Sequence, residues 1–189
     1  MKVRTRIAPS PTGEMHIGTM RTLLYDYALA KKDHGGFVMR VEDTDRERLV
    51  EGAIDRLIDT VKNYGLSWDE GPDIGGPFGP YVQSERLDIY KKYSKELIES
   101  GHAYYCFCTK ERLDELRAEQ QAQKLPVTKY DKHCLHLSKG EIQNNLINNV
   151  PYVVRLKVPE NETISFKDEI LGEISFPSND VDDQVLLKS

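Results

Sequence analysis

The run from Arg6 to Thr19, RIAPSPTGEMHIGT, concentrates residue types that can bind a phosphate. Residues 3–8 predict a short strand, which must end at the Pro and Gly residues that follow because regular strand pairing cannot continue through them. A helix begins inside the run, so its free backbone N–H groups lie close to the end of the strand. The N-terminus of a helix attracts anions, and we therefore predict a phosphate site at this point.

Four residues of the run have the types expected of ligand contacts. His16 and Thr19 would project from the first helical turn toward the phosphate, while Gly13 and Gly18 would let the backbone approach a ligand. Neither GxGxxG nor GxxxxGK followed by Ser or Thr occurs in the chain, so this is not a standard nucleotide fingerprint. From the spacing alone, a capping role for His16 and a tight turn at Gly18 explain the residues equally well.

Arg6 and Glu42 form a second candidate pair. Residues 37–41 predict a second strand, and Glu42 follows its C-terminal end, where an open α/β sheet presents ligand-binding groups. The guanidinium of Arg6 could hold a carboxylate through two parallel N–H donors. The residue types alone nevertheless favour a structural ion pair between Arg6 and Glu42.

The cysteines indicate a metal site. Cys106-x-Cys108 is followed, after 25 intervening residues, by Cys134-x-His136, and the chain has no other Cys. Two such pairs on two turns can surround one tetrahedral zinc ion. Buried thiols with a surface His are the alternative interpretation, because free Cys is commonly just buried. His133 is a weaker rival for the fourth ligand.

Composition limits the kinds of protein that the chain can be. With 189 residues, of which 39% are hydrophobic and 30% charged, it can form a core and is too apolar for a disordered chain. No apolar run approaches the roughly 20 residues that span a bilayer, and the N-terminus lacks the apolar stretch of an export signal. The odd number of Cys favours a reduced, cytoplasmic protein. A net charge of -5 leaves room only for a local nucleic-acid-binding patch.

The first hundred residues predict alternating strands and helices. Two stretches carry apolar residues at helical spacing, the second of them closed by Gly65. The two stripes consist of Met20, Leu23, Leu24 and Tyr27, and of Val50, Ala53, Ile54, Leu57, Ile58 and Val61. The order strand, helix, strand, helix is that of a right-handed parallel unit. We therefore predict an α/β fold that begins with the first half of a doubly wound, Rossmann-like parallel sheet.

The pattern changes near Tyr105. Before it, a loop rich in Gly and Pro over 65–83 leads to a helix that Ser84 would cap, with an apolar stripe made by Leu87, Tyr90, Leu97 and Ile98. After it, the sequence predicts a charged helix capped by Thr109, a capping box, and strands over 152–158, 163–167 and 173–176. The capping box consists of Ser138 and Glu141. We place a domain boundary at residue 105.

Several motifs in order resemble one protein family. The run APSPTG followed by HIGT over residues 8–19 resembles the HIGH signature of class I aminoacyl-tRNA synthetases, and its form is similar to bacterial-type glutamyl-tRNA synthetases. The likeness continues in RVEDTD over 40–45, GLSWDEGP over 65–72, QSER over 83–86 and DDQVLLKS over 182–189. It therefore covers nearly all of the chain.

The resemblance implies roles for single residues. Arg6 would hold the side-chain carboxylate of a glutamate substrate and Glu42 its ammonium group, with Ala8 and Ser10 in the same pocket. His16, Gly18 and Thr19 would be catalytic, because they stabilise charge on the α-phosphate of ATP as glutamate attacks it. The implied ATP contacts are Pro9, Thr12, Gly13, His16, Gly18 and Thr19. We expect the His16 and Arg6 side chains to face one cleft.

The implied activity is that of a glutamate–tRNA ligase. Glutamate and ATP, with Mg²⁺ on the phosphates, would give glutamyl-adenylate, and glutamate would pass to the terminal adenosine of tRNA(Glu). Thr44, Asp45 and Arg48 would contact that adenosine, although a solvated turn explains them equally well. Residues 1–105 would be half of the catalytic domain, and 106–189 an inserted α+β domain that binds the tRNA acceptor end. The whole protein would be a cytoplasmic monomer.

The resemblance also bears on the cysteines. Some family members carry zinc at this C-x-C…C-x-H spacing in the inserted domain, which implies one structural Zn²⁺ with no position open for substrate. A tRNA-modifying paralogue uses a Tyr ligand instead. Tyr130, four residues before Cys134, is therefore a rival to His136 as the fourth ligand.

The family's second catalytic signature, a KMSKS-type lysine loop, does not occur in the sequence, so we expect an N-terminal fragment that is inactive alone.

Two alternatives to the ligase remain. A glutamyl-queuosine tRNA(Asp) synthetase shares the HIGH region and the zinc cysteines, but the run EDTDRER and the long segment over 109–129 favour the ligase. From a different class, the chain could be a non-catalytic tRNA-binding module.

Overall fold

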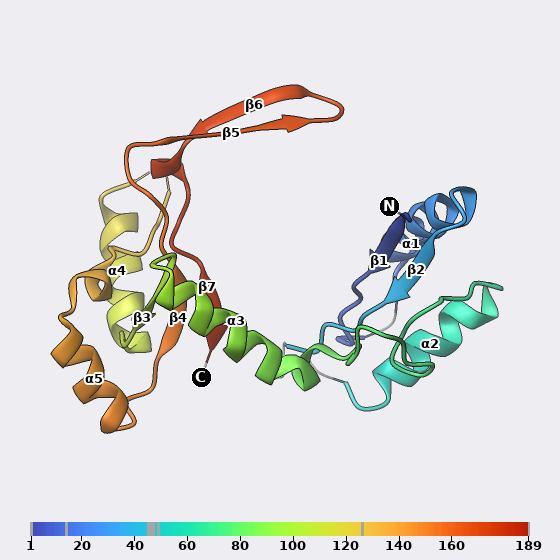
Figure 1. Cartoon of the computed structure of the whole chain (residues 1–189), viewed down its shortest axis with the longest axis horizontal. Coiled ribbons are helices and arrows are strands. Elements are labelled where there is room, and N and C mark those ends of the chain that lie inside the picture. Colours follow the sequence, from blue (N-terminus) through green and yellow to red (C-terminus); the bar gives the residue numbers. More distant parts are fainter. Residues whose placement is uncertain (1, 14, 45–47, 49, 126, 189) are drawn as a thin grey trace. The chain divides into compact units, whose positions relative to one another are not determined.

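The computed structural model describes residues 2–13, 15–44, 48, 50–125 and 127–188. It contains two compact units, Met1–Ile89 and Tyr90–Ser189 (Figure 1). The division falls within a helix, earlier in the chain than the predicted boundary at residue 105. Residues 103–106 pair with later strands and so belong to the second unit. Within the described ranges, no helix is long and apolar enough to cross a membrane.

The first unit is built on two parallel strands. β1 (Arg4–Ile7) is followed by α1 (Ile17–Lys32), β2 (Gly36–Met39) and α2 (Ala53–Asn63). This order confirms the predicted strand–helix–strand–helix arrangement, with β1 parallel to β2. Two short segments extend the pairing on the far side of β2: Met39 N–H donates to Glu70 O and Val41 N–H donates to Tyr81 O, both at 2.9 Å. The fold of this unit is thus mixed α/β around a parallel layer.

The core of the first unit lies on one face of the β1–β2 pair. Side chains alternate along a strand, so residues such as Ile7 face the helices while Arg4 and Arg6 face the other way. The buried cluster on the helix side consists of Ile7, Met20, Leu23, Ala30, Phe37, Met39, Leu57, Ile58, Val61 and Trp68. Two predicted stripe residues are not in it: Leu24 is 49% exposed and Val50 is 42% exposed.

The exposure of Leu24 and Val50 has a local reason in each case. Leu24 directly follows the fully buried Leu23, so it lies about 100° farther around α1, beyond the edge of the buried stripe. Val50 precedes the helix it was predicted to join, because α2 begins at Ala53 after Gly52 in the left-handed conformation, φ 69°. The stripe therefore starts one turn later than the sequence predicts.

The Gly- and Pro-rich loop before the third helix is ordered by polar contacts. Trp68 is buried, and its Nε1 donates to Asp73 Oδ1 at 2.8 Å. Arg4 contacts both carboxylate oxygens of Glu70, and the Tyr81 hydroxyl donates to the same carboxylate. These bonds hold the loop against the face of β1 that carries the arginines.

Over its described residues, the second unit contains an antiparallel sheet, three α-helices and a hairpin. α3 (Leu87–Glu99) spans the division between the units and follows a short 3₁₀ turn, Gln83–Arg86. β3 (Ala103–Cys106), β4 (Val153–Leu156) and β7 (Val185–Lys188) form one sheet in the order β3-β4-β7. α4 (Lys110–Ala122), a 3₁₀ turn (His133–His136) and α5 (Lys139–Ile147) lie between β3 and β4 in the sequence. β5 (Thr163–Asp168) and β6 (Gly172–Pro177) form the hairpin, and a 3₁₀ turn (Ser178–Asp180) follows it.

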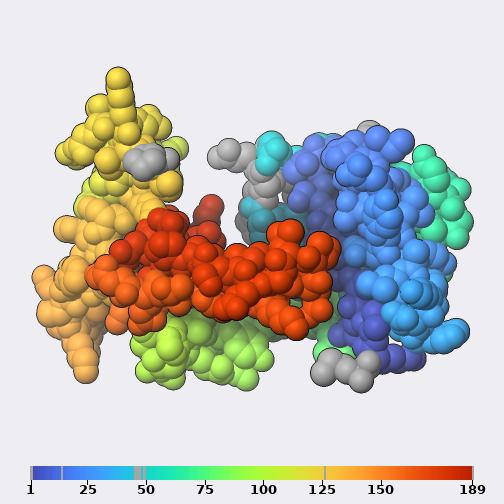
Figure 2. Space-filling model, turned by 90° about the horizontal axis from the view of Figure 1, so that it is seen from above, coloured from blue at the N-terminus to red at the C-terminus, as the bar shows by residue number. Residues whose placement is uncertain are grey.

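The hairpin is largely exposed (Figure 2), and Ile170 at its tip is 92% exposed. The predicted caps at Thr109 and at Ser138 with Glu141 are confirmed. The predicted cap at Ser84 is wrong, because its hydroxyl and its N–H both donate to the Asp43 carboxylate, at 2.6 and 2.8 Å. Leu87, predicted to face inward, is 43% exposed.

Candidate functional site

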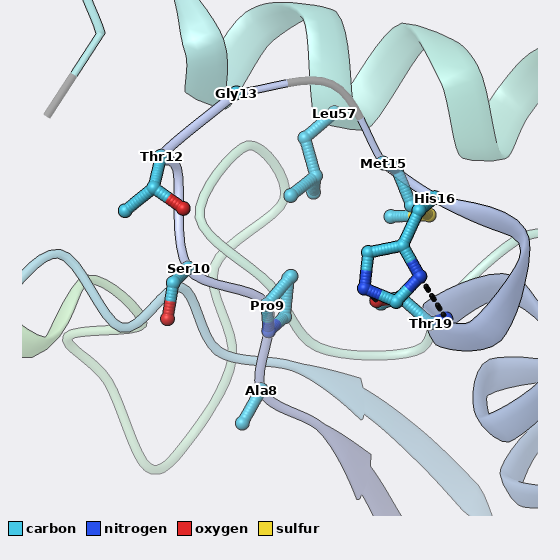
Figure 3. A pocket seen from close by; sticks show the side chains of 9 residues that line it. All are labelled: Ala8, Pro9, Ser10, Thr12, Gly13, Met15, His16, Thr19 and Leu57. Carbon is cyan, nitrogen blue, oxygen red and sulfur yellow. Dashed lines mark hydrogen bonds between the residues drawn. The ribbon is translucent and has the colours of Figure 1, made fainter. Parts of the chain in front are cut away.

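The loop between β1 and α1 encloses a cavity of about 330 Å³ (Figure 3). Figure 3 shows the His16 ring at its rim, with Leu57 of α2 across from it. The residues that line it are Ala8, Pro9, Ser10, Thr12, Gly13, Met15, His16, Thr19 and Leu57. The structure thus brings together seven of the residues predicted from the sequence. Met15 and Leu57 add an apolar wall that the motif does not reveal, since Leu57 has the spacing of a core residue.

His16 is the N-cap of α1. Its Nδ1 accepts hydrogen bonds from the backbone N–H groups of Gly18 at 3.1 Å and Thr19 at 3.4 Å. Because Nδ1 accepts, the proton of the neutral ring sits on Nε2, which lies 3.3 Å from Thr19 Oγ1. The capping interpretation is therefore correct, and the same geometry places the Nε2–H donor beside the Thr19 hydroxyl, which also lines the cavity. His16 is exposed, so an anion can reach it.

Gly18 makes room for the His16 ring. A Cβ at position 18 would stand 3.0 Å from both His16 Nδ1 and His16 Cε1, closer than side-chain packing normally allows. We predicted that Gly18 would let a ligand approach the backbone. In the structure, the imidazole of His16 occupies the space beside the Gly18 α-carbon. Gly13 has φ 150°, a conformation that favours glycine, and open space beside it.

The loop is held in place by backbone hydrogen bonds to later segments. Pro9 O accepts from Glu42 N–H at 2.9 Å, and Pro11 O accepts from Val50 N–H at 3.2 Å. Pro11 is fully buried. Glu42 is thus adjacent to the loop that lines the cavity, although its side chain does not line it.

Arg6 and Glu42 form an ion pair. Arg6 Nη1 donates to Glu42 Oε1 at 3.0 Å, and Arg40 Nη2 donates to the same oxygen at 3.3 Å. The structural ion pair favoured by the residue types is therefore present. For Glu42 Oε2, no hydrogen-bond partner is found in the described part of the chain.

Arg6 lines a second cavity of about 300 Å³. Its other lining residues are Arg4, Thr5, Val38, Arg40, Phe78, Tyr81 and Arg86. His16 and Arg6, which we expected to face one cleft, thus line two different cavities among the described residues. The reason is strand alternation: Arg6 projects from the face of β1 opposite the helices, whereas His16 begins the helix that packs on the other face. The loop that starts at Ala8, directly after β1, lines the first cavity.

The residues expected at the tRNA adenosine lie at the surface where the structure describes them. Thr44 and Arg48 are exposed, and Asp45 lies outside the described residues. The neighbouring Asp43 instead binds Ser84, as described above.

Three cysteines meet in the second unit. The sulfur atoms of Cys106, Cys108 and Cys134 lie within 4.8 Å of one another, and Cys108 Sγ is 3.5 Å from Cys134 Sγ. Sulfurs around a tetrahedral zinc, with Zn–S bonds of about 2.3 Å, stand about 3.8 Å apart. Cys106 and Cys134 are buried, and all three thiols are free. The cluster therefore fits a zinc ion of the kind predicted.

His136 is not part of this group. It is exposed, and no fourth His, Asp or Glu among the described residues brings a ligand atom within 4.8 Å of all three sulfurs. The reason is local: residues 133–136 form a 3₁₀ turn, with about 120° per residue, so the side chains of Cys134 and His136 diverge. Cys106 ends a strand, where alternate side chains share one face, and its partner Cys108 does reach the cluster.

Tyr130 occupies the remaining side of the cluster. Its Oη lies 3.3 Å from Cys106 Sγ and 3.2 Å from Cys108 Sγ, and it accepts a hydrogen bond from Cys134 N–H at 3.0 Å. Two cations flank the group. Arg112 Nη1 donates to Cys108 Sγ at 3.5 Å, and the Arg155 guanidinium stacks over the Tyr130 ring at 4.0 Å.

The ionisation of the group is uneven. The Cys134 thiol donates to Cys106, and this outweighs burial and lowers the pKa of Cys106 to about 4. The same interaction raises the pKa of Cys134, while burial and the neighbouring sulfurs raise the pKa of Tyr130. The pKa of Cys106 is thus lowered while those of Cys134 and Tyr130 are raised, and a bound dication would lower the pKa of each group that ligates it.

Comparison with known proteins gives a consistent result. The family described as tRNA synthetases class I (E and Q), catalytic domain, matches residues 2–189. The chain is 60% identical over 188 residues to a glutamate–tRNA ligase of Clostridium botulinum, and 57% identical to that of Clostridium kluyveri. These alignments cover all of this chain and 39% and 38% of the relatives. The chain thus spans about two fifths of their length.

Solved structures agree with the sequence comparison. A glutamate–tRNA ligase from Elizabethkingia meningosepticum, in complex with its amino acid, superimposes with a TM-score of 0.90 at 41% identity. The glutamate–tRNA synthetase of Elizabethkingia anophelis gives a TM-score of 0.91. Both cover all of this chain and 39% of the solved chains. The fold and the loop before α1 are those of a class I tRNA synthetase catalytic domain. The chain belongs to the catalytic-domain family of the glutamate and glutamine enzymes.

Proposed function

We propose that the protein is a glutamate–tRNA ligase. The observation that carries the proposal is the pair of sites at the end of β1: a helix N-terminus with an imidazole donor on one side, and an arginine–glutamate pair on the other. The first suits a phosphate, because backbone N–H groups and the helix dipole favour negative charge. The second suits an amino acid that carries both a carboxylate and an ammonium group. The identity to glutamate–tRNA ligases supports this assignment.

In this proposal the two sites serve the two substrates of the activation step. Arg6 binds the side-chain carboxylate of glutamate and Glu42 binds its ammonium group. Ala8 and Ser10, which follow β1 directly and line the first cavity, contact the end of glutamate that meets ATP. Pro9, Thr12 and Gly13 hold ATP. The Nε2–H of His16, the Gly18 backbone and the Thr19 hydroxyl stabilise charge on the α-phosphate as the glutamate carboxylate displaces pyrophosphate. Mg²⁺ accompanies ATP on the phosphates and supplies charge neutralisation there.

We assign the first unit to the N-terminal half of the Rossmann-like catalytic domain and the second unit to the inserted domain for the tRNA acceptor end, with the boundary moved from the predicted residue 105 to the division after Ile89. Thr44, Asp45 and Arg48 remain proposed contacts to the terminal adenosine of tRNA(Glu). Three free thiols agree with a cytoplasmic location, where thiols stay reduced. We expect the whole protein to act as a monomer.

The test is charging by the full-length product of the gene that encodes this chain. It should attach radiolabelled glutamate to tRNA(Glu) with ATP and Mg²⁺. Attachment of glutamate to the queuosine base of tRNA(Asp), with none to the 3′-terminal adenosine, would instead favour the glutamyl-queuosine synthetase. Salt-sensitive tRNA binding without any transfer of glutamate would favour a non-catalytic module.

We further infer that the cysteine cluster holds one structural Zn²⁺. Cys106, Cys108 and Cys134 supply three ligands, and the geometry favours Tyr130 over the sequence-predicted His136 for the fourth. The ion would link β3 to the segment before α5 and so fix the fold of the second unit. Elemental analysis of protein purified without chelator should find about one zinc per chain. A value near zero would contradict the inference.

A further inference from the structure

Arg40 has no role in the function proposed for Arg6 and Glu42, yet it contacts Glu42 directly. It directly follows β2, and its backbone N–H donates to Ile7 O at 3.1 Å, which fixes its position beside the end of β1. Its Nη2 reaches Glu42 Oε1 at 3.3 Å, the oxygen that also accepts from Arg6 at 3.0 Å. Two guanidinium groups therefore share one carboxylate oxygen.

The two arginines are not equivalent. The Arg6 side chain is 41% exposed, whereas that of Arg40 is 25% exposed. Arg40 Nε is buried and has no hydrogen-bond partner within the described part of the chain. Arg6 is thus the more accessible of the two partners of Glu42, and Arg40 is the more buried one.

Substrate binding would disturb the shared pairing. If Arg6 turns to the side-chain carboxylate of glutamate, Glu42 loses its closer cation just as further carboxylates enter the cavity. The charges of glutamate, Arg6, Glu42 and Arg40 sum to zero, whereas the same set without Arg40 is negative. Arg40 therefore compensates the Glu42 charge while Oε2, free of protein partners in the described residues, faces the ligand ammonium.

We propose that Arg40 is a positioning residue for glutamate: it holds Glu42 oriented and ionised when Arg6 engages the substrate carboxylate. The proposal rests on the proposed function and adds a residue to it. Arg40 acts through Glu42, so its loss should weaken recognition of the ammonium group in particular.

The test compares Arg40→Gln and Arg40→Lys with wild type in the full-length protein. Arg40→Gln should raise the KM for glutamate roughly ten- to a hundredfold, the loss expected for a hydrogen bond to a charged group, with the KM for ATP unchanged. Glutarate, which lacks the ammonium group, should inhibit both proteins with similar constants. Arg40→Lys should recover much of the glutamate affinity. The Arg40→Gln/Glu42→Gln double variant should lose little more than Glu42→Gln alone.

The outcomes separate the two proposals. A wild-type protein that does not charge glutamate overturns the proposed function. A wild type that charges normally, with an Arg40→Gln variant of unchanged glutamate KM, overturns only the role of Arg40. Equal weakening of glutamate and glutarate also overturns it, because Arg40 would then contact a carboxylate directly. Arg117→Gln, at a residue 65% exposed on α4, serves as the matched control and should change none of these constants.

Discussion

The imidazole of His16 rests directly against the α-carbon of Gly18. The ring accepts the Gly18 N–H through Nδ1, and a methyl group on Gly18 would meet the ring at 3.0 Å. The hydrogen bond to Nδ1 caps α1. Because Nδ1 is the acceptor, the ring proton is on Nε2, which lies beside the Thr19 hydroxyl. The helix start and the phosphate donor are therefore the same structural feature.

Gly18→Ala should displace the His16 ring without unfolding the protein. Ala is a better helix former than Gly, so the free energy of unfolding should change by no more than about 1 kcal/mol. Glutamate-dependent ATP–pyrophosphate exchange should fall by about tenfold or more, since a misplaced donor no longer meets the developing charge. The measurements are exchange kinetics and thermal unfolding of the full-length protein.

Gly140→Ala is the matched control for Gly18→Ala. Gly140 is also the second residue of its helix, and a Cβ there would meet nothing closer than the Ser138 hydroxyl at 4.0 Å. It should leave exchange unchanged. Normal exchange by Gly18→Ala would show that the ring position is not critical.

Two substitutions at His16 separate capping from catalysis. Asn caps helices well, so His16→Asn should keep the free energy of unfolding close to wild type, whereas His16→Ala should lose about 1 kcal/mol. Both should lose pyrophosphate exchange by roughly a hundredfold, because neither supplies the imidazole N–H. Chemical denaturation and exchange rates give the two readouts. An active His16→Asn variant would reduce His16 to a capping residue.

The sequence predicts the first unit well because its signals are local. The run after β1 combines a strand end, a Pro–Gly loop and a helix start, and each of these depends on neighbours in the chain. The positions of His16, Gly18 and Thr19 follow from that order. The separation of Arg6 from His16 depends instead on which face of β1 each side chain takes, and β1 is too short to show an alternating pattern.

The fourth position at the cysteine cluster shows the same limit. Cys134-x-His136 matches a ligand spacing, but the spacing assumes an extended chain in which alternate residues share a face. A 3₁₀ turn at 133–136 rotates His136 away from the sulfurs. Tyr130 reaches them because of how the segment before this turn folds, which no local spacing predicts. β3 and β7 are also missed, since neither alternates apolar and polar residues.

Zinc affinity should depend on Tyr130 and not on His136. Tyr130→Phe removes only the phenolic oxygen, so the ring and its contact with Arg155 can remain. The zinc affinity of this variant should fall by more than about tenfold. Loss of a group that only hydrogen-bonds to a ligand already lowers metal affinity by about tenfold, and loss of a ligand should cost more. His136→Ala should bind zinc like wild type. Competition with a chromophoric chelator measures both, and the opposite order would restore His136 as the ligand.

Asp73→Asn should remove a pH-dependent part of the stability of the first unit. Burial acts to raise the pKa of Asp73, but hydrogen bonds from Lys62 Nζ at 2.9 Å and Trp68 Nε1 at 2.8 Å outweigh it. The pKa in the folded protein therefore lies below its ordinary value of 3.8. A lowered carboxyl pKa contributes stability above the unfolded pKa, and this contribution disappears as the pH falls through the folded pKa.

Urea unfolding followed by the fluorescence of Trp68, the only Trp in the sequence, measures this effect. At pH 7 we expect Asp73→Asn to lower the free energy of unfolding by about 1–2 kcal/mol. The difference from wild type should shrink as the pH falls below about 4, because the wild-type carboxylate then takes up a proton. Asp59→Asn, at an exposed position of α2, should show no such pH dependence. A difference that stays constant down to the acid transition would mean that the charge of Asp73 is irrelevant and only its shape matters.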